Sequence, residues 1–215
     1  MTDSDVAQYL QEHPEFLDAH VDILAKIRIP DPHEGRAIPL AERQMAQLRE
    51  RTRILEEKLA ELIAFGEEND AISERMHRVT LALIAAPSLD DVLGTFYFHL
   101  REDFSVPHIA VRIWGMDDAP DRAEFALVSE EVVAFNDSLT SPYCTHHAML
   151  DSINWFADVQ PLLQSFAYVK LAGEKFNGLL VLASEDVERF YPEMGTLYLQ
   201  RLGDIASAAI ARYLE

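Results

Sequence analysis

Hydrophobic residues recur at steps of three and four from Leu40 to Ala86, in the longest regular pattern of the chain. The stretch contains no proline and a single glycine, Gly66, and residues with high helix propensity dominate it. The pattern predicts one helix of about 45 residues. A stripe this narrow cannot bury itself within one chain, so the simplest arrangement that covers it is a parallel pair with a second copy. We expect residues 40–86 to form a coiled-coil dimerisation helix.

The predicted dimer seam follows the heptad positions of this helix. Its members are Leu48, Leu55, Leu59, Leu62, Phe65, Ile72, Met76, Val79 and Leu83. Asn69 also falls on the seam, where a polar residue can fix the register. The repeat slips once, because Leu59, Leu62 and Phe65 stand three and three apart, and such a slip overwinds a coiled coil locally. Two interpretations stay open, a tolerated defect and a signalling hinge near Gly66.

The chain before this helix predicts two short helices and a linker, in a segment of residues 1–39. The first helix is expected from Ser4, as the cap, to Gln11, and His13-Pro14 ends it because proline disfavours helical geometry in the residue before it. The second carries the apolar residues from Phe16 to Ile27. Residues 29–39 are rich in proline and glycine, which is typical of a linker.

After Pro87 the periodicity changes along the chain, which predicts a separate domain over residues 87–215. The expected elements are a helix over 89–104 capped by Ser88, strands over 108–115 and 124–129, a short helix over 129–139, a strand hairpin over 165–173 and 176–184, and a closing helix over 193–215. This order predicts an α+β fold, in which an antiparallel sheet carries helices on one face.

Several strings add a family resemblance to this order of elements. They are VAQYLQEHPEFLDAHVDILAKIRIP (6–30), ERQMAQLRERTRILEEKLAELI (42–63), SPYC (141–144) and ASEDVERFYPEMGTLYLQRLGDI (183–205). The chain resembles the bacterial family catalogued as domain of unknown function 484, and its last domain resembles the GAF sensor fold. The resemblance implies dimers formed through the N-terminal helix, and it carries over no activity or ligand. The sequence has no NKFDE-type motif and Cys144 is followed by Thr145, which disfavours cyclic nucleotides and bilins.

Charge and apolar content limit the classes of partner. The net charge is −19, and residues 87–215 hold 20 acidic and 8 basic side chains. Nucleic acids and anionic membranes both attract cationic surfaces, so direct binding to either is disfavoured. The apolar runs are shorter than a membrane span. The acidic, polar N-terminus and the single cysteine, Cys144, favour a cytoplasmic protein.

The reactive side chains cluster around Cys144, within the string YCTHH. Thiolate and imidazole groups bind zinc or iron, but the paired ligands of a structural zinc site are absent. A cysteine–histidine nucleophile would use Cys144 and His146, and no oxyanion-hole motif accompanies them. The remaining interpretations are plain core packing and an apolar ligand pocket formed by Tyr143, Cys144, His146, Trp155 and Phe166.

These observations predict a non-enzymatic homodimer that serves as a GAF-like regulatory or protein-interaction module. The alternative is a small-molecule sensor with its ligand in the GAF-like pocket. The sequence identifies no catalytic residue, metal site or cofactor. An acidic loop with Asp117, Asp118 and Asp121 lacks the spacing of a calcium-binding EF-hand, and it favours a hairpin turn instead.

Overall fold

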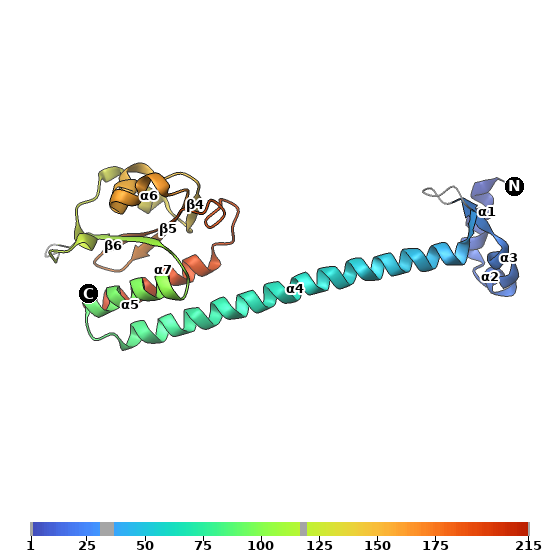
Figure 1. Cartoon of the computed structure of the whole chain (residues 1–215), viewed down its shortest axis with the longest axis horizontal. Coiled ribbons are helices and arrows are strands. Elements are labelled where there is room, and N and C mark those ends of the chain that lie inside the picture. Colours follow the sequence, from blue (N-terminus) through green and yellow to red (C-terminus); the bar gives the residue numbers. More distant parts are fainter. Residues whose placement is uncertain (1, 31–36, 117–119, 215) are drawn as a thin grey trace. The chain divides into compact units, whose positions relative to one another are not determined.

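The computed structural model describes residues 2–30, 37–116 and 120–214 of the chain (Figure 1). The chain consists of two compact units, Met1–Asn69 and Asp70–Glu215. The helix α4, Leu40–Ala85, begins in the first unit and ends in the second. This confirms the predicted long helix. Within the described part of the chain, no helix combines the length and the apolar character that a bilayer span requires.

Three short helices precede α4 in the first unit. They are α1 (Asp3–Glu12), α2 (Glu15–Ala19) and α3 (Val21–Lys26). Thr2, and not Ser4, caps α1: its hydroxyl accepts from the Asp5 amide, and the Asp5 carboxylate accepts from the Thr2 amide at 2.7 Å. This reciprocal capping box satisfies two backbone donors, which explains why the helix begins earlier than predicted. The predicted second helix is interrupted at His20, whose backbone leaves helical geometry.

Two short strands flank residues 31–36, which lie outside the described residues. The strand β1 (Arg28–Pro30) pairs antiparallel with β2 (Ala37–Pro39), and Ile29 stands opposite Ile38. The sequence predicted a linker over 29–39, but the two ends of that segment form a ladder. β-Branched residues such as isoleucine favour strands, and they outweigh the proline signal here.

The second unit contains a sheet and the helices that cover it. After α4 come α5 (Leu89–Glu102), β3 (His108–Trp114), the 3-10 helix η1 (Ala123–Phe125), α6 (Glu130–Ser138), β4 (Tyr143–Thr145), the 3-10 segment η2 (Leu150–Leu162), β5 (Ser165–Ala172), β6 (Asn177–Ser184) and α7 (Leu197–Leu214). The predicted cap of α5 is confirmed, since the Ser88 hydroxyl accepts from the Asp91 amide at 3.1 Å.

The four strands of this unit form an antiparallel sheet in the order β3-β6-β5-β4. The predicted hairpin is confirmed: β5 and β6 pair from Ser165 opposite Ser184 to Ala172 opposite Asn177. The strand β4 pairs only with the first part of β5, where Cys144 stands opposite Ala167. The predicted α+β class is therefore confirmed.

Helices cover both faces of the sheet, whereas the sequence predicted helices on one face. Figure 1 shows α5 and α7 on one side of β5 and β6, and α6 on the other. Val111, Val169 and Leu180 point into the core shared with α5 and α7, while Tyr168 and Val181 point into the core beside α6. Both faces need cover because β5 and β6 are apolar along nearly their whole length.

Residues 124–129, which the sequence predicted as a strand, do not join the sheet. Instead η1 begins this segment and the chain continues without regular structure to the cap of α6 at Ser129. The Glu124 side chain is buried, so the apparent alternation reflects contacts beside β3 and not a ladder. Asp117 and Asp118 lie outside the described residues, so of the turn predicted with Asp121 only its last part is described, where Asp121 forms a bend.

Candidate functional site

The first part of α4 exposes a stripe of large apolar side chains. Leu48, Leu55, Leu59, Leu62 and Phe65 have exposed fractions between 52% and 66%. All five belong to the predicted seam. A shallow groove of about 300 Å³ lies on the same stretch, lined by Met45, Leu48, Arg49, Thr52, Arg53 and Glu56. A contiguous apolar surface of this kind marks an interaction site more often than a solvated face.

Charged side chains flank the stripe and form ion pairs with one another along the helix. The Arg53 guanidinium donates to Glu50, with its Nε atom 3.0 Å from Oε2, and it also pairs with Glu57 one turn later. These pairs are exposed, and they link neighbouring turns of the helix at i,i+3 and i,i+4 spacing. The hydrogen bond from Arg53 lowers the pKa of the Glu50 carboxyl.

The last part of the predicted seam is not available to a second chain. Met76, Val79 and Leu83 are buried in the core of their own unit, together with residues of α5 and α7. Hydrogen bonds fix this packing, since the Tyr213 hydroxyl donates to the Ala86 carbonyl at 2.6 Å. The prediction of a dimer seam is therefore wrong for these three residues. The apolar periodicity was genuine, but the surface that it packs on belongs to the same chain.

The sheet divides the predicted ligand pocket. Residues that pair directly across an antiparallel ladder share a face, so Tyr143 lies with Tyr168 while Cys144 lies with Ala167 on the opposite face. Trp155 and Phe166 pack on the face that α6 covers, and Cys144 belongs to the core of α5 and α7. No single pocket can therefore contain all five residues that the sequence brought together.

Cys144 and His146 lie in different environments. The thiol is buried, and burial raises its pKa to about 11, so it is neutral at physiological pH and a poor nucleophile. His146 follows β4 and is exposed. In the described ranges, no three His, Cys, Asp or Glu side chains gather closely enough to hold a metal ion. This geometry gives no support to either the nucleophile or the metal interpretation.

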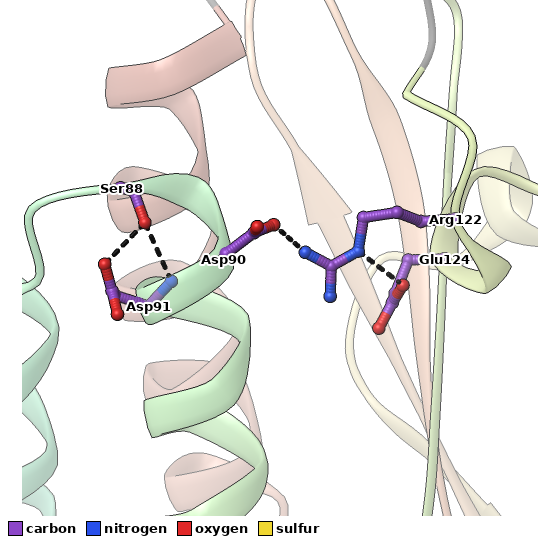
Figure 2. A network of polar contacts seen from close by, with 5 residues as sticks. All are labelled: Ser88, Asp90, Asp91, Arg122 and Glu124. Carbon is purple, nitrogen blue, oxygen red and sulfur yellow. Dashed lines mark hydrogen bonds and ion pairs between the residues drawn. The ribbon is translucent and has the colours of Figure 1, made fainter.

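A polar cluster that the sequence did not predict lies beside β3 (Figure 2). The Arg122 guanidinium reaches in two directions, to the Asp90 carboxylate of α5 and to the buried Glu124, with Nε 3.3 Å from Oε2. Tyr97 also forms a hydrogen bond with Glu124. The pKa of the Tyr97 phenol is raised mainly by burial and, to a lesser extent, by the negative charge of Glu124. Arg122 and Glu124 are two residues apart, but Asp90 and Tyr97 belong to α5, so no local motif indicates the whole cluster.

The same region contains an arginine that stacks on an aromatic ring. The Arg112 guanidinium carbon lies 4.9 Å from the ring centroid of Trp155, and its Nη1 donates to the Val111 carbonyl at 2.9 Å. Burial lowers the pKa of this guanidinium, and the nearby Glu124 opposes that effect. With its charge balanced by Glu124 and its face covered by Trp155, Arg112 ties β3 to η2.

An open cleft of about 530 Å³ lies in the second unit between α7 and the end of β5. Its lining is mixed in polarity and comprises Leu139, Thr140, Ser141, Lys170, Ala172, Gly173, Glu174, Gln200, Asp204, Ser207, Ala208 and Ala211. The Ser207 hydroxyl accepts from the Ala172 amide at 3.1 Å, which satisfies a backbone donor at the end of β5, beyond its pairing with β4. None of the predicted pocket residues lines this cleft.

Fold and surface together define a class of protein, an α+β domain joined to a long helix with an exposed apolar stripe. The chain belongs to the family described as protein of unknown function, DUF484, whose match covers residues 1–215. It is similar to the uncharacterized protein YigA of Shigella flexneri (33% identical) and of Escherichia coli strain K12 (32%). The YigA protein of Salmonella typhimurium strain LT2 is 25% identical. Each comparison covers 100% of this chain and 93% of the relative.

Proposed function

We propose that this protein is a cytoplasmic, non-enzymatic homodimer in which paired α4 helices carry two GAF-like regulatory or protein-interaction domains. The observation that carries the proposal is the stripe of Leu48, Leu55, Leu59 and Leu62, each at least 58% exposed on a helix with a seven-residue repeat. Leaving these side chains in water forgoes about 1.5–3 kcal/mol for each leucine. A second copy of the same stripe covers them with matching knobs and holes.

Charges beside the stripe favour a parallel pair of identical chains. If Leu48 and Leu55 occupy position d of the heptad, Arg51 falls at g and Glu56 at the following e. In a parallel coiled coil, g of one helix faces that e of its partner, so Arg51 of one copy meets Glu56 of the other. Both side chains are exposed in the single chain. This complementarity supports a second copy over an unrelated helix.

The non-enzymatic part of the proposal is supported by the chemistry near Cys144. Its neutral thiol and the exposed His146 form no nucleophile pair, and the polar cluster around Glu124 consists of mutually satisfied charges. A regulatory domain acts through a binding surface or a pocket, and it requires no catalytic nucleophile pair. The proposal of a GAF-like domain is supported by the antiparallel four-stranded sheet between helical layers.

The dimer is tested by breaking the stripe with Leu55→Asp and Leu62→Asp in one chain. Because each carboxylate would be buried opposite its own copy, we expect sedimentation equilibrium to give a dimer for the wild type and a monomer for the double variant at micromolar concentration. Leu127→Asp is the matched control, since Leu127 is fully exposed and does not belong to α4. A double variant that stays dimeric, or a wild type that is monomeric, contradicts the proposal.

A second candidate function, small-molecule sensing on the α6 face, is favoured by Asn136. This side chain is 0% exposed, and neither its amide nitrogen nor its oxygen has a hydrogen-bond partner among the described residues. Buried polar groups are nearly always paired, so a ligand that accepts from and donates to this amide would explain it. Native mass spectrometry of the freshly isolated protein would reveal such a ligand as added mass, and unchanged mass counts against the sensor.

A further inference from the structure

The cleft between α7 and the end of β5 lies where two neighbouring strands part. The short strand β4 begins at Tyr143, opposite Tyr168 of β5. Residues 139–141 precede β4, lie outside its ladder and line the cleft together with the last part of β5. Small residues line much of the remainder, namely Ala172, Gly173, Ala208 and Ala211. The resulting hollow of about 530 Å³ has the size of a small-molecule site.

Polar groups of α7 line one side of this cleft. Gln200, Asp204 and Ser207 stand four and three residues apart, so they share a face of the helix. The Gln200 amide donates to Asp204 Oδ1 at 2.9 Å, which orients the carboxylate. The Ser207 hydroxyl accepts from the Ala172 amide and keeps its own hydrogen to donate. This face of α7 therefore offers both an acceptor and a donor to a ligand.

Opposite charges line the cleft without neutralising each other. Lys170, at the end of β5, is half-buried, and Asp204 is exposed. Within the ranges that the structure describes, neither side chain forms an ion pair. Ionised groups form the strongest hydrogen bonds with groups of the opposite charge. A cation and a carboxylate that border one hollow thus complement a molecule that carries both charges.

The other lining residues disfavour most further classes of ligand. Glu174 adds a second carboxylate, so a phosphate group would meet more negative than positive charge. The lining residues of the described chain include no aromatic side chain, so a nucleobase would have no ring to stack on. A wholly apolar ligand would cover the charged groups without pairing them, which is costly.

From these observations we propose that the cleft binds a free α-amino acid through its two charged groups. The ammonium of the ligand donates to Asp204, and its carboxylate accepts from Lys170 and Ser207. The side chain of the ligand lies over Ala208 and Ala211, where the lining residues are small. This inference does not depend on the proposed dimer, because every lining residue belongs to the second unit of a single chain.

The helix α7 also connects the cleft with the end of α4 in the same unit. The hydroxyl groups of Tyr198 and Ser73 are 3.1 Å apart, and Arg212 Nη1 donates to the Ile84 carbonyl at 3.0 Å. A ligand held on α7 therefore binds the helix to which α4 is bonded. Because the cleft exists only in the folded unit, a ligand in it raises the thermal stability of that unit by mass action.

Ligand binding to the full-length chain tests the inference. We expect at least one of the common L-amino acids, at millimolar concentration, to raise the thermal midpoint of the sheet unit. Isothermal titration calorimetry then compares that amino acid with its N-acetyl derivative, which lacks the ammonium, and with its amide, which lacks the carboxylate. Each derivative should bind about tenfold more weakly or worse, because each loses a charge-assisted hydrogen bond.

Variants of the lining residues assign the binding to this cleft. Ala208→Trp fills the hollow and should abolish binding. Asp204→Asn should remove the preference for the amino acid over its N-acetyl derivative, and Lys170→Gln the preference over its amide. Ala134→Trp and Asp137→Asn, at exposed positions of α6 that do not line the cleft, are the matched controls and should leave the affinity unchanged. Unfolding midpoints measured without ligand show whether each variant is folded.

Three results would each overturn the inference. One is that no amino acid binds in either measurement. Another is that an amino acid binds equally well to the wild type and to a folded Ala208→Trp variant, which would place it elsewhere. The third is equal affinity for the amino acid and both of its derivatives. None of these results affects the proposed dimer, which sedimentation of the wild type decides separately.

Discussion

Asn136 lies on the side of α6 whose neighbours belong to a core. Val132 is buried in that core, and Phe135 and Leu139 pack against it. Tyr168, a polar residue in the same core, is fully paired: its hydroxyl accepts from the Met149 amide at 2.7 Å and bonds the Ser152 hydroxyl at 3.0 Å. Asn136 has no such arrangement among the described residues. A substitution at Asn136 therefore tests whether a bound ligand supplies the hydrogen bonds that the protein does not.

Replacing Asn136 with leucine separates an empty site from an occupied one. In the ligand-free protein we expect Asn136→Leu to raise the free energy of unfolding by about 1–2 kcal/mol, because it removes a buried amide with unmet hydrogen bonds. Urea denaturation measures the change, and Asn154→Leu, at an exposed position of η2, serves as control. If the same substitution costs more than about 2 kcal/mol in the protein as freshly isolated, before small molecules are removed, the amide has a partner there, which would favour the sensor.

At the scale of elements, α4 and α5 are joined by a charged link at the edge of their apolar contact. The Asp103 carboxylate, which follows α5, lies 2.6 Å from His99 Nδ1 and 3.2 Å from Arg78 Nη2 of α4. The hydrogen bond from His99, together with Arg78, lowers the pKa of Asp103. Since the folded pKa is depressed, this pairing stabilises the fold above the ordinary carboxyl pKa near 4 and is lost as the pH falls through the lower folded value.

Asp103→Asn should therefore destabilise the protein in a pH-dependent way. We expect a loss of about 1 kcal/mol at pH 7, where the carboxylate is ionised, and a much smaller loss at pH 3. Chemical denaturation of both proteins at the two pH values measures the difference. Glu102→Gln, at the adjacent exposed position, should change little at either pH. An equal loss at pH 7 and pH 3 would assign the effect to packing and not to charge.

The elements themselves were predictable wherever local pattern decides them. The strand β3, the hairpin of β5 and β6, and the cap Ser88 follow from alternation and from side-chain chemistry within a few residues. The predictions that were wrong or missing concern tertiary contacts. Whether Cys144 faces α7 or α6 depends on its register against Ala167. The environment of Glu124 includes Tyr97 of α5, which only the fold brings to it.

The sequence also did not predict that the first part of α4 exposes its apolar stripe while the last part packs on its own unit. Both halves of α4 show apolar residues at helical spacing, and a pattern alone does not say whether a stripe packs on its own chain or on another. Burial separates them: Val79 is 1% exposed, whereas Leu62 is 66% exposed. The predicted seam residues before Asn69 therefore remain candidates for dimerisation, and Met76, Val79 and Leu83 do not.

At the scale of the whole molecule, the two units have different sources of stability. The sheet unit draws its core from one chain, with Leu93, Phe176, Leu180 and Ile210 all buried within it. It should therefore unfold independently of protein concentration. The first part of α4 has no such core, and in the proposed dimer its stability comes from a second chain, so mass action makes it depend on concentration.

Thermal unfolding at two concentrations tests this difference. We expect helical circular dichroism at 222 nm to show an early transition, from the first part of α4, whose midpoint rises by several degrees when the protein is concentrated a hundredfold. Near-ultraviolet signals of Trp114 and Trp155 should report a later transition with a constant midpoint, because both side chains pack in the sheet unit. The variant with Leu55→Asp and Leu62→Asp should lose the early transition and keep the later one. If all signals move together with concentration, the sheet unit also depends on a second chain for its fold, and its core would have to extend across the dimer.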